Sequence, residues 1–390
     1  MPTLQLPDGE TLSPDGGAAP RIAFDASCMA GGAAPSITLA DTLRVVEAHV
    51  PAALVGDGAR ARVMGVAARL PAALSRWAYL ECRLAEGAAQ VDASVVLDED
   101  GRDVVAGANP AIGLPGDLLE RDEWRRVRAL CRAWAGADAD VAAWTTGVWL
   151  EFDVPADAGT VPVPGVFVYS SHEALRPGPL PTAPEGARRA LEILRGSTLP
   201  AELARGLDRC WASLPPGAHA PHVGAMLSRG APSLRVCVTG AAREEVPGFL
   251  ADAGWPGDAA ALARLLSELE HDGAPEPAMV QVDMAGSANA RVGIEYALDR
   301  APQASGALPR GAFLDALVRR GLCAPAKRAA LAEWPGAALH ELAHQLWPSV
   351  VSRRVNHVKL VLGASGPVEA KAYLSVDHRI HRPRPAPRQG

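Results

Sequence analysis

The chain of 390 residues lacks a basic excess, a long apolar run and a closely spaced pair of cysteines. Its formal net charge of −6 argues against a general nucleic-acid binder, because such proteins carry a positive field. No apolar run approaches the length of a membrane span, and residues 1–19 lack the basic segment and apolar core of a secretion signal. We therefore expect a cytoplasmic protein with no membrane span and no nucleic-acid partner.

The six cysteines are widely scattered, and no two of them have the CxxC spacing of metal or redox motifs. Scattered cysteines in a cytoplasmic protein are usually reduced thiols in the core. Aromatic residues make up only 5% of the chain, and only four of them are tyrosines. We expect neither disulfides nor a cysteine-bound metal.

Five pairs of candidate strands recur along the chain, and helical stretches separate each pair from the next. The pairs cover residues 79–84 with 91–97, 148–153 with 165–170, 222–227 with 233–239, 280–284 with 291–298, and 356–362 with 368–376. A recurring unit usually closes or stacks to bury what one unit cannot bury alone. Ten antiparallel strands could close into one barrel, which leaves no exposed edge and encloses a lumen.

The order of elements predicts an α+β fold of five ααββ repeats, with a ten-stranded antiparallel β-barrel ringed by α-helices. Residues 1–36 are rich in Gly, Pro and Asp and are expected to form a flexible arm. Residues 37–377 are expected to form a single domain. The basic, proline-rich residues 378–390 have the composition of a disordered tail.

Alternation along each strand separates an apolar face from a face of mixed polar and charged residues. The apolar faces must meet the helices, so the polar faces point inward; a half-solvated surface sheet is the alternative. The charged residues on these faces include Arg235, Arg291, Lys359, Lys371, Glu151, Asp283 and Glu295. Enclosing them is costly unless they form ion pairs or bind a ligand. The cluster therefore suits a diphosphate or another multiply charged anion, with carboxylates left for acid–base chemistry.

Three of the predicted strands resemble those of the ABBA, or PT-barrel, family of aromatic prenyltransferases. The segments are Val148-Trp149-Leu150-Glu151-Phe152, Ser233-Leu234-Arg235-Val236-Cys237-Val238 and Val368-Glu369-Ala370-Lys371-Ala372-Tyr373-Leu374. The resemblance implies that Arg235 holds an allyl diphosphate and that Glu151 assists the aromatic nucleophile. It also implies that Lys371 and Tyr373 belong to a Lys-x-Tyr strand. Family members line the barrel with tyrosines, whereas this chain has four, so we expect an interior poor in tyrosine.

Together these features predict a prenyltransferase-like enzyme that binds an isoprenoid diphosphate and an aromatic or peptide acceptor in the lumen. Glu151 and Glu295 are the candidate catalytic carboxylates. Asp283 could hold Mg²⁺ beside the diphosphate if it faces the lumen. The side chains expected to bind the substrate are Arg235, Arg291, Lys359, Lys371 and Tyr373.

A competing motif, His340-Glu341-Leu342-Ala343-His344, has the HExxH pattern of zinc peptidases. On a helix over residues 337–347, His340 and His344 would share a face and could bind Zn²⁺, with Glu341 as the general base. A zinc-dependent hydrolase is therefore the alternative function. A non-catalytic barrel that binds a peptide or a metabolite is the third.

Overall fold

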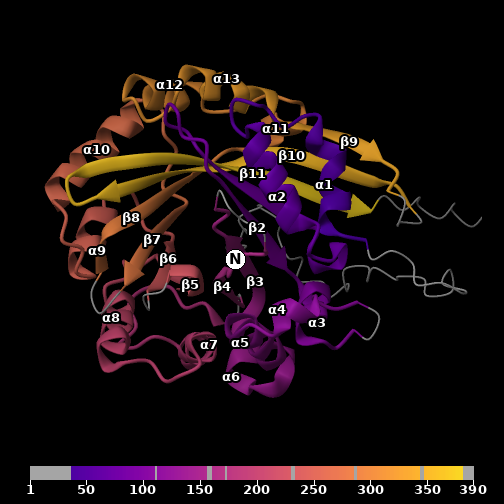
Figure 1. Ribbon diagram of the computed structural model, residues 1–390. Coiled ribbons are helices and arrows are strands. Elements are labelled where there is room, and N and C mark those ends of the chain that lie inside the picture. Colours follow the sequence, from indigo (N-terminus) through magenta and orange to yellow (C-terminus); the bar gives the residue numbers. More distant parts are fainter. Residues whose placement is uncertain are drawn as a thin grey trace, which may run out of the picture.

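The structure, a computed structural model, describes residues 37–109, 112–155, 160–171, 174–229, 233–284, 288–342 and 347–380. Antiparallel strands form a closed barrel at its centre, and helices lie around the outside (Figure 1). The expected barrel and its α+β class are therefore confirmed. The expected arm, residues 1–36, and residues 381–390 of the expected tail lie outside the described residues.

Ten strands form the ring, and each is antiparallel to its neighbours. In ring order they are β1 (Trp77–Arg83), β2 (Val91–Leu97), β3 (Thr145–Phe152), β4 (Gly165–Ser170), β5 (His219–Met226), β6 (Leu234–Thr239), β7 (Met279–Met284), β8 (Ala288–Ala297), β10 (Ser349–Gly363) and β11 (Gly366–Ile380). The strand β11 pairs with both β10 and β1, and this double pairing closes the ring. The strand also runs three residues into the segment 378–390 that composition assigned to a tail.

A helical stretch precedes each hairpin of the ring, but the number of helices varies among the described residues. The helices are α1 (Leu39–Glu47) and α2 (Asp57–Ala67); α3 (Glu99–Ala106), α4 (Gly116–Leu119), α5 (Asp122–Arg132) and α6 (Ala139–Trp144); α7 (Glu185–Arg195) and α8 (Ala201–Ala212); α9 (Val246–Asp252) and α10 (Ala259–His271); and α11 (Arg300–Ala304), α12 (Gly311–Arg319) and α13 (Pro325–Glu333). Four helices precede the second hairpin and three precede the fifth, so the unit is not uniformly two helices and two strands. In the described part of the chain, no helix is both long enough and apolar enough to cross a bilayer.

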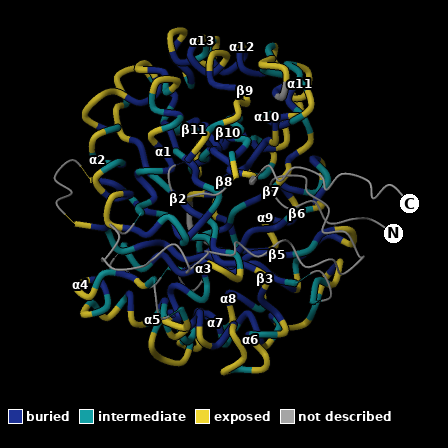
Figure 2. Tube along the Cα trace, turned by 90° about the vertical axis from the view of Figure 1, so that its right-hand side faces the viewer, coloured by how far each residue is buried: buried dark blue, intermediate teal, exposed yellow. Residues whose placement is uncertain are grey.

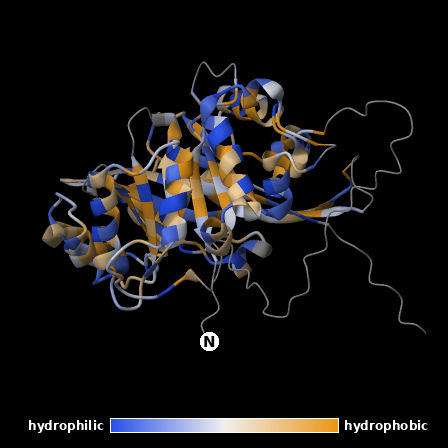
Figure 3. Ribbon diagram, turned by 90° about the horizontal axis from the view of Figure 1, so that it is seen from below, coloured by the Kyte–Doolittle hydropathy of each residue, from blue (hydrophilic) through white to orange (hydrophobic). Residues whose placement is uncertain are grey.

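The main apolar core lies between the outer face of the barrel and the helices. On β3, Val148, Leu150 and Phe152 point outward and are almost fully buried, and Phe152 stacks on Trp124 of α5 with ring centroids 6.2 Å apart. Burying each such side chain contributes about 1.5–3 kcal/mol. Figure 2 shows buried residues along the strands and exposed residues on the outer helices and loops, and Figure 3 shows apolar and polar residues alternating along the strands. The outer layer thus leaves the polar faces of the strands to fill the barrel.

The described part of the HExxH segment, residues 340–342, does not form the expected helix. Its first residue ends strand β9 (Gly336–His340), which pairs antiparallel with residues 349–353 of β10. Glu341 follows outside any helix, and His344 lies outside the described residues. The ladder with β10 satisfies this backbone, so tertiary pairing overrides a local helical preference. The helix prediction is therefore wrong, and with it the helical geometry on which the zinc-hydrolase alternative depends.

The described cysteines are buried free thiols: Cys82, Cys131, Cys210, Cys237 and Cys323. Cys28 lies outside the described residues. Cys237 stands on the inner face of β6, opposite His222, and burial holds the pKa of its thiol far above the usual range. A thiol held in its neutral form is a weak nucleophile, so we assign none of these thiols a catalytic role.

Candidate active site

The closed barrel brings most of the predicted charged residues together on its inner face. Residues directly opposite each other in an antiparallel ladder share a face, and Arg235 is opposite Asp283. Lys359 is opposite Glu295 on one side and Lys371 on the other. Arg235 is 7% exposed and Lys359 is 5% exposed, so the half-solvated surface sheet is excluded. Arg291 belongs to the same strand face as Glu295 but is exposed near the start of β8.

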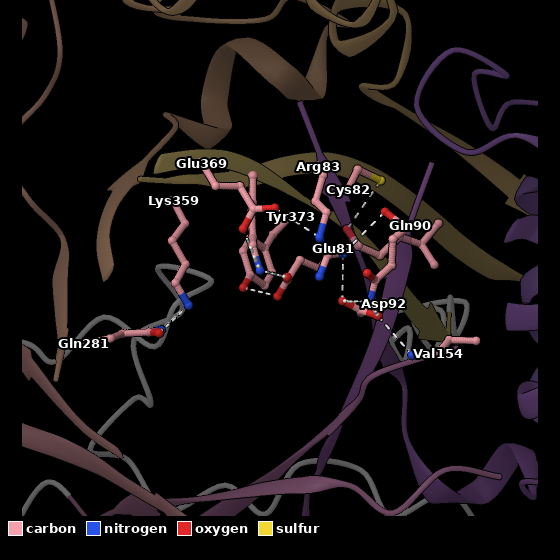
Figure 4. Close-up of polar contacts among 12 residues, drawn as sticks. Glu81, Cys82, Arg83, Gln90, Asp92, Val154, Gln281, Lys359, Glu369 and Tyr373 are labelled. Carbon is pink, nitrogen blue, oxygen red and sulfur yellow. Dashed lines mark hydrogen bonds and ion pairs between the residues drawn. The ribbon is translucent and has the colours of Figure 1, made fainter. Parts of the chain in front are cut away.

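A buried ionic network joins β1, β2 and β11 (Figure 4). At its centre, Glu81 accepts a hydrogen bond from Lys371 Nζ at 2.6 Å and another from the hydroxyl of Tyr373. Arg83 extends the network, with its Nη1 2.9 Å from Asp92 Oδ2 and its Nε 3.1 Å from a carboxylate oxygen of Glu369. The network therefore fixes Lys371 and Tyr373, two of the predicted substrate-binding residues, to a carboxylate of β1.

Glu81 is ionised in this network. Burial disfavours its charge, but the ammonium groups of Lys371 and Lys359 and the two hydrogen bonds outweigh it and hold the pKa of Glu81 far below its usual range. Sequence analysis missed Glu81, although it lies inside a predicted strand. Glu81 lies two residues from Tyr79 and two from Arg83, so the three side chains share one face of the strand, and that face is polar. This alternation is the signal from which Glu81 could have been identified.

Glu151 lies on the inner face of β3, and its pKa is raised, whereas that of Glu81 is lowered. Burial, and next the negative charge of Glu81, raise the pKa of Glu151 to about 7, although Arg235 and Lys359 partly oppose the shift. Near neutral pH this carboxyl group therefore exchanges a proton readily, whereas Glu81 stays charged. Two carboxyl groups with pKa values driven apart are the arrangement expected of acid–base chemistry.

Arg235 and Asp283 form a bidentate pair across β6 and β7. The Nε–Oδ1 distance is 2.5 Å and the Nη2–Oδ2 distance is 3.0 Å. The guanidinium also lies over the ring of Phe167, 5.6 Å from its centroid. Although burial opposes the charge, Asp283 holds the pKa of Arg235 well above its usual value. Arg235 is therefore a permanent cation, but one whose charge is largely neutralised within the protein.

Lys359 differs from the other inner cations in its partners. Its ammonium donates to Gln281 Oε1, and it lies 5.9 Å from the ring centroid of Tyr373. It forms no ion pair with a carboxylate among the described residues. Gln281 in turn donates from Nε2 to Glu295 at 2.5 Å, and Glu295 lies 3.5 Å from His357 Nε2. Burial, followed by the charge of Arg235, lowers the pKa of Lys359. An incoming anion would restore the charge balance at this ammonium.

Aromatic rings form a belt across the interior. Tyr79 stacks on Trp149 with ring centroids 4.5 Å apart, Trp149 stacks on Tyr169 at 6.3 Å, and Tyr169 lies 3.8 Å from the ring of His222. On the side of β10 and β11, His357 stacks on Tyr373 at 4.0 Å. The inner surface therefore presents π faces from at least five strands.

The interior holds most of the chain's few tyrosines. Tyr79, Tyr169 and Tyr373 all face inward, and the remaining tyrosine, Tyr296, packs outside against Phe313 of α12 at 5.1 Å. Trp149 on β3 adds another ring to the inner surface. Composition gives the number of tyrosines but not the face that each one occupies, and tryptophan, phenylalanine and histidine rings contribute as well.

Asp283 does not form a resident metal site as it stands. Both of its carboxylate oxygens face the guanidinium of Arg235. In the part of the chain that the structure describes, no group of three or more His, Cys, Asp or Glu residues is placed to hold a metal ion. The assignment of Mg²⁺ to Asp283 therefore remains a prediction, and no catalytic step is derived through it.

Comparisons with known proteins find distant similarities to solved structures and give no residue a role. No family model and no curated protein sequence matches the chain. Among solved structures, it is similar to 5-dimethylallyltryptophan synthase from Streptomyces coelicolor, with 17% identity, a TM-score of 0.44, and coverage of 87% of this chain and 98% of that one. It is also similar to prenyltransferase PriB in a ternary complex with L-tryptophan and dimethylallyl thiolodiphosphate, with 16% identity, a TM-score of 0.47, and coverage of 89% of this chain and 99% of that one. A third similar structure is AnaPT from Neosartorya fischeri, with 12% identity, a TM-score of 0.40, and coverage of 78% of this chain and 77% of that one. At such low identities and TM-scores, the function has to be argued from this chain's own residues.

Proposed function

We propose that this protein transfers a prenyl group from an isoprenoid diphosphate to an electron-rich aromatic acceptor inside the barrel. The observation that carries the proposal is a belt of aromatic rings beside buried cations and carboxylates. The ammonium of Lys359 already lies over the ring of Tyr373, which shows that these π faces accommodate positive charge. An allylic cation has the same requirement, because it must be shielded from water and stabilised until the acceptor attacks.

The donor requires cations, since its diphosphate carries several negative charges. Lys359 meets this requirement best because its described partners are the neutral Gln281 and a ring. Arg235 and Lys371 contribute less charge, because Asp283 and Glu81 already face them. When the donor reacts, the C–O bond breaks and its electron pair leaves with the diphosphate.

The acceptor ring then forms a C–C bond with the allylic carbon and must lose a proton to become aromatic again. Glu151 takes that proton, because a pKa of about 7 suits a base that works near neutral pH. Glu81 stays ionised and stabilises the positive charge that passes through the site. Glu295 acts through Gln281 and Lys359 as a positioning residue.

Incubation with dimethylallyl or geranyl diphosphate and a panel of indoles and phenols tests this function. We expect a prenylated product in the mass spectrum and stoichiometric release of diphosphate. The variant Lys359→Ala should bind the donor at least tenfold more weakly by calorimetry, since it loses the cation that has no carboxylate partner among the described residues. If neither donor binds the wild-type protein, the proposal fails, and a barrel that binds an aromatic ligand without catalysis replaces it.

The variant Asp283→Asn tests whether Asp283 balances the charge of Arg235 or holds Mg²⁺. If Asp283 only balances Arg235, its loss frees positive charge, and we expect inorganic diphosphate to bind several-fold more tightly, with or without EDTA. The exposed Asp252→Asn on α9 is the matched control and should change nothing. Weaker binding by Asp283→Asn, together with a requirement for Mg²⁺ in the wild-type protein, would instead assign the metal to Asp283.

A further inference from the structure

Lys359 reaches its hydrogen-bond partner across a strand that carries neither of them. Lys359 is on β10 and Gln281 is on β7, and β8 lies between these two strands in the ring. Two strand spacings separate β7 from β10, or about 10 Å. The ammonium of Lys359 nevertheless donates to Gln281 Oε1, and Figure 4 shows the two side chains meeting at their ends. The lysine stem therefore passes over the inner face of β8.

Gly293 is the residue of β8 at the crossing. It is buried, and it lies directly opposite Gln281 on β7 and Val361 on β10. A Cβ atom at this position would lie 2.6 Å from Lys359 Cε, 3.4 Å from Gln281 Cβ and 3.5 Å from Gln281 Oε1. Carbon atoms in contact need about 3.5–4.0 Å, so the lysine stem fills the space that a side chain at residue 293 would need.

The backbone itself does not require a glycine at this position. Gly293 is not among the glycines with a left-handed φ, and it pairs with both neighbouring strands. A glycine inside a strand weakens it and often marks the close approach of another group. At Gly224 on β5 that group is the ring of Phe167, which a Cβ atom would meet at 2.4 Å. At Gly293 it is the stem of a cation.

The crossing also decides which group faces the Lys359 ammonium. Glu295 on β8 is directly opposite Lys359, and opposite charges in this position usually attract each other. Among the described residues, however, no ion pair joins the two. Gln281 stands between them, because it accepts from Lys359 and donates from Nε2 to Glu295 at 2.5 Å. The ammonium therefore keeps a neutral partner instead of a carboxylate.

We propose that Gly293 is a positioning residue, which lets Lys359 cross β8 and so keeps its ammonium away from Glu295 and available to the donor's diphosphate. A side chain at residue 293 would displace the flexible lysine stem, and the ammonium would then turn to Glu295. The inference rests on the proposed function only for the identity of the anion. The crossing itself can be tested without a donor.

NMR of the lysine side chains tests the crossing directly, because the chain has only three lysines: Lys327, Lys359 and Lys371. In protein labelled with ¹³C at lysine Cε, a pH titration gives one pKa for each signal, and single substitutions assign the signals. Gly293→Ala should raise the pKa of Lys359, since Glu295 would then stabilise the ammonium. The pKa values of Lys327 and Lys371 should not change.

Calorimetry with inorganic diphosphate gives the second readout. We expect Gly293→Ala to bind it about tenfold more weakly than the wild-type protein, because the cation is neutralised. In the Lys359→Ala background, Gly293→Ala should cause no further loss, since its effect passes through the lysine. The matched control is Gly165→Ala on the inner face of β4, where a Cβ atom would meet only the uncharged end of Met226 at 3.0 Å and, at 3.8 Å, a stem carbon of Glu151. This control should leave diphosphate binding and the pKa of Lys359 unchanged.

The proposal is wrong if Gly293→Ala leaves the pKa of Lys359 or the affinity for diphosphate as in the wild-type protein. It is also wrong if Gly293→Ala weakens diphosphate binding equally with and without Lys359. If Gly293→Ala does not fold, Gln281→Leu decides: it removes the acceptor beyond β8 and should raise the pKa of Lys359, and an unchanged value overturns the proposal. If that pKa rises as expected but the wild-type protein binds no diphosphate, the crossing stands and donor binding is what fails.

Discussion

Replacing Glu151 with glutamine is expected to lower the rate of prenyl transfer by about 100-fold or more, a loss typical of removing a general base. The amide keeps the size of the side chain but cannot accept the proton that the acceptor ring releases. Donor binding should change little, because Glu151 contributes no cation to the diphosphate. The measurement is single-turnover product formation, which separates the chemical step from product release.

The pH dependence of the reaction checks the same assignment. Burial and the charge of Glu81 raise the pKa of Glu151 to about 7, so the carboxyl group is mostly protonated below that pH and mostly ionised above it. The wild-type rate should therefore rise with pH through about 7, and Glu151→Gln should lose this limb. Glu202→Gln, an exposed change on α8, is the control. An unchanged profile in Glu151→Gln would assign the base to another group.

Removing the charge of Glu81 should lower the stability of the folded protein strongly. We expect Glu81→Gln to lower the free energy of unfolding by about 3–5 kcal/mol, because breaking a buried ion pair leaves its partner uncompensated. That partner is Lys371, which among the described residues would keep only Glu369 at 3.5 Å, and Tyr373 would lose its charged acceptor. Urea unfolding followed by circular dichroism measures the difference.

A second change and a pH series show whether this loss is electrostatic. Adding Lys371→Met to Glu81→Gln removes the unpaired charge and should restore most of the stability. The folded-state pKa of Glu81 is depressed, so its stabilisation is present above the unfolded-state value of about 4.3 and is lost as the pH falls below that value. The gap between wild type and Glu81→Gln should therefore be full at pH 7 and shrink below about pH 4. A gap independent of pH, or a double variant no more stable than the single one, would point to packing instead.

Much of the fold and part of the site could be predicted because strand periodicity is a local property. A side chain two residues along a strand always returns to the same face, so Glu151, Arg235, Lys359 and Lys371 could be placed on inner faces from the sequence. The apolar opposite faces identified the side covered by helices, and ten such strands predicted closure.

The errors came from properties that depend on neighbours distant in the sequence. The HExxH segment has an acceptable helical pattern, yet the first half of β10 offers a ladder, and β9 forms on it instead. The tyrosine count suggested too few rings, but the face of each ring follows from strand register. Glu81 was overlooked because nothing near it in the sequence marks it; its partners Lys371 and Tyr373 are about 290 residues away.

The sequence by itself therefore determined the recurring hairpins, the two faces of each strand and the type of charge that each inner face carries. The tertiary structure alone decided which charges meet, and with them which carboxyl group is ionised and which exchanges a proton near pH 7. The physical reason is that face alternation depends on adjacent residues, whereas a pKa depends on burial and on charges within a few ångströms. The pairing of β11 with β1 brings Lys371 to Glu81. This contact favours the ionised form of Glu81, whereas Glu151 titrates near pH 7.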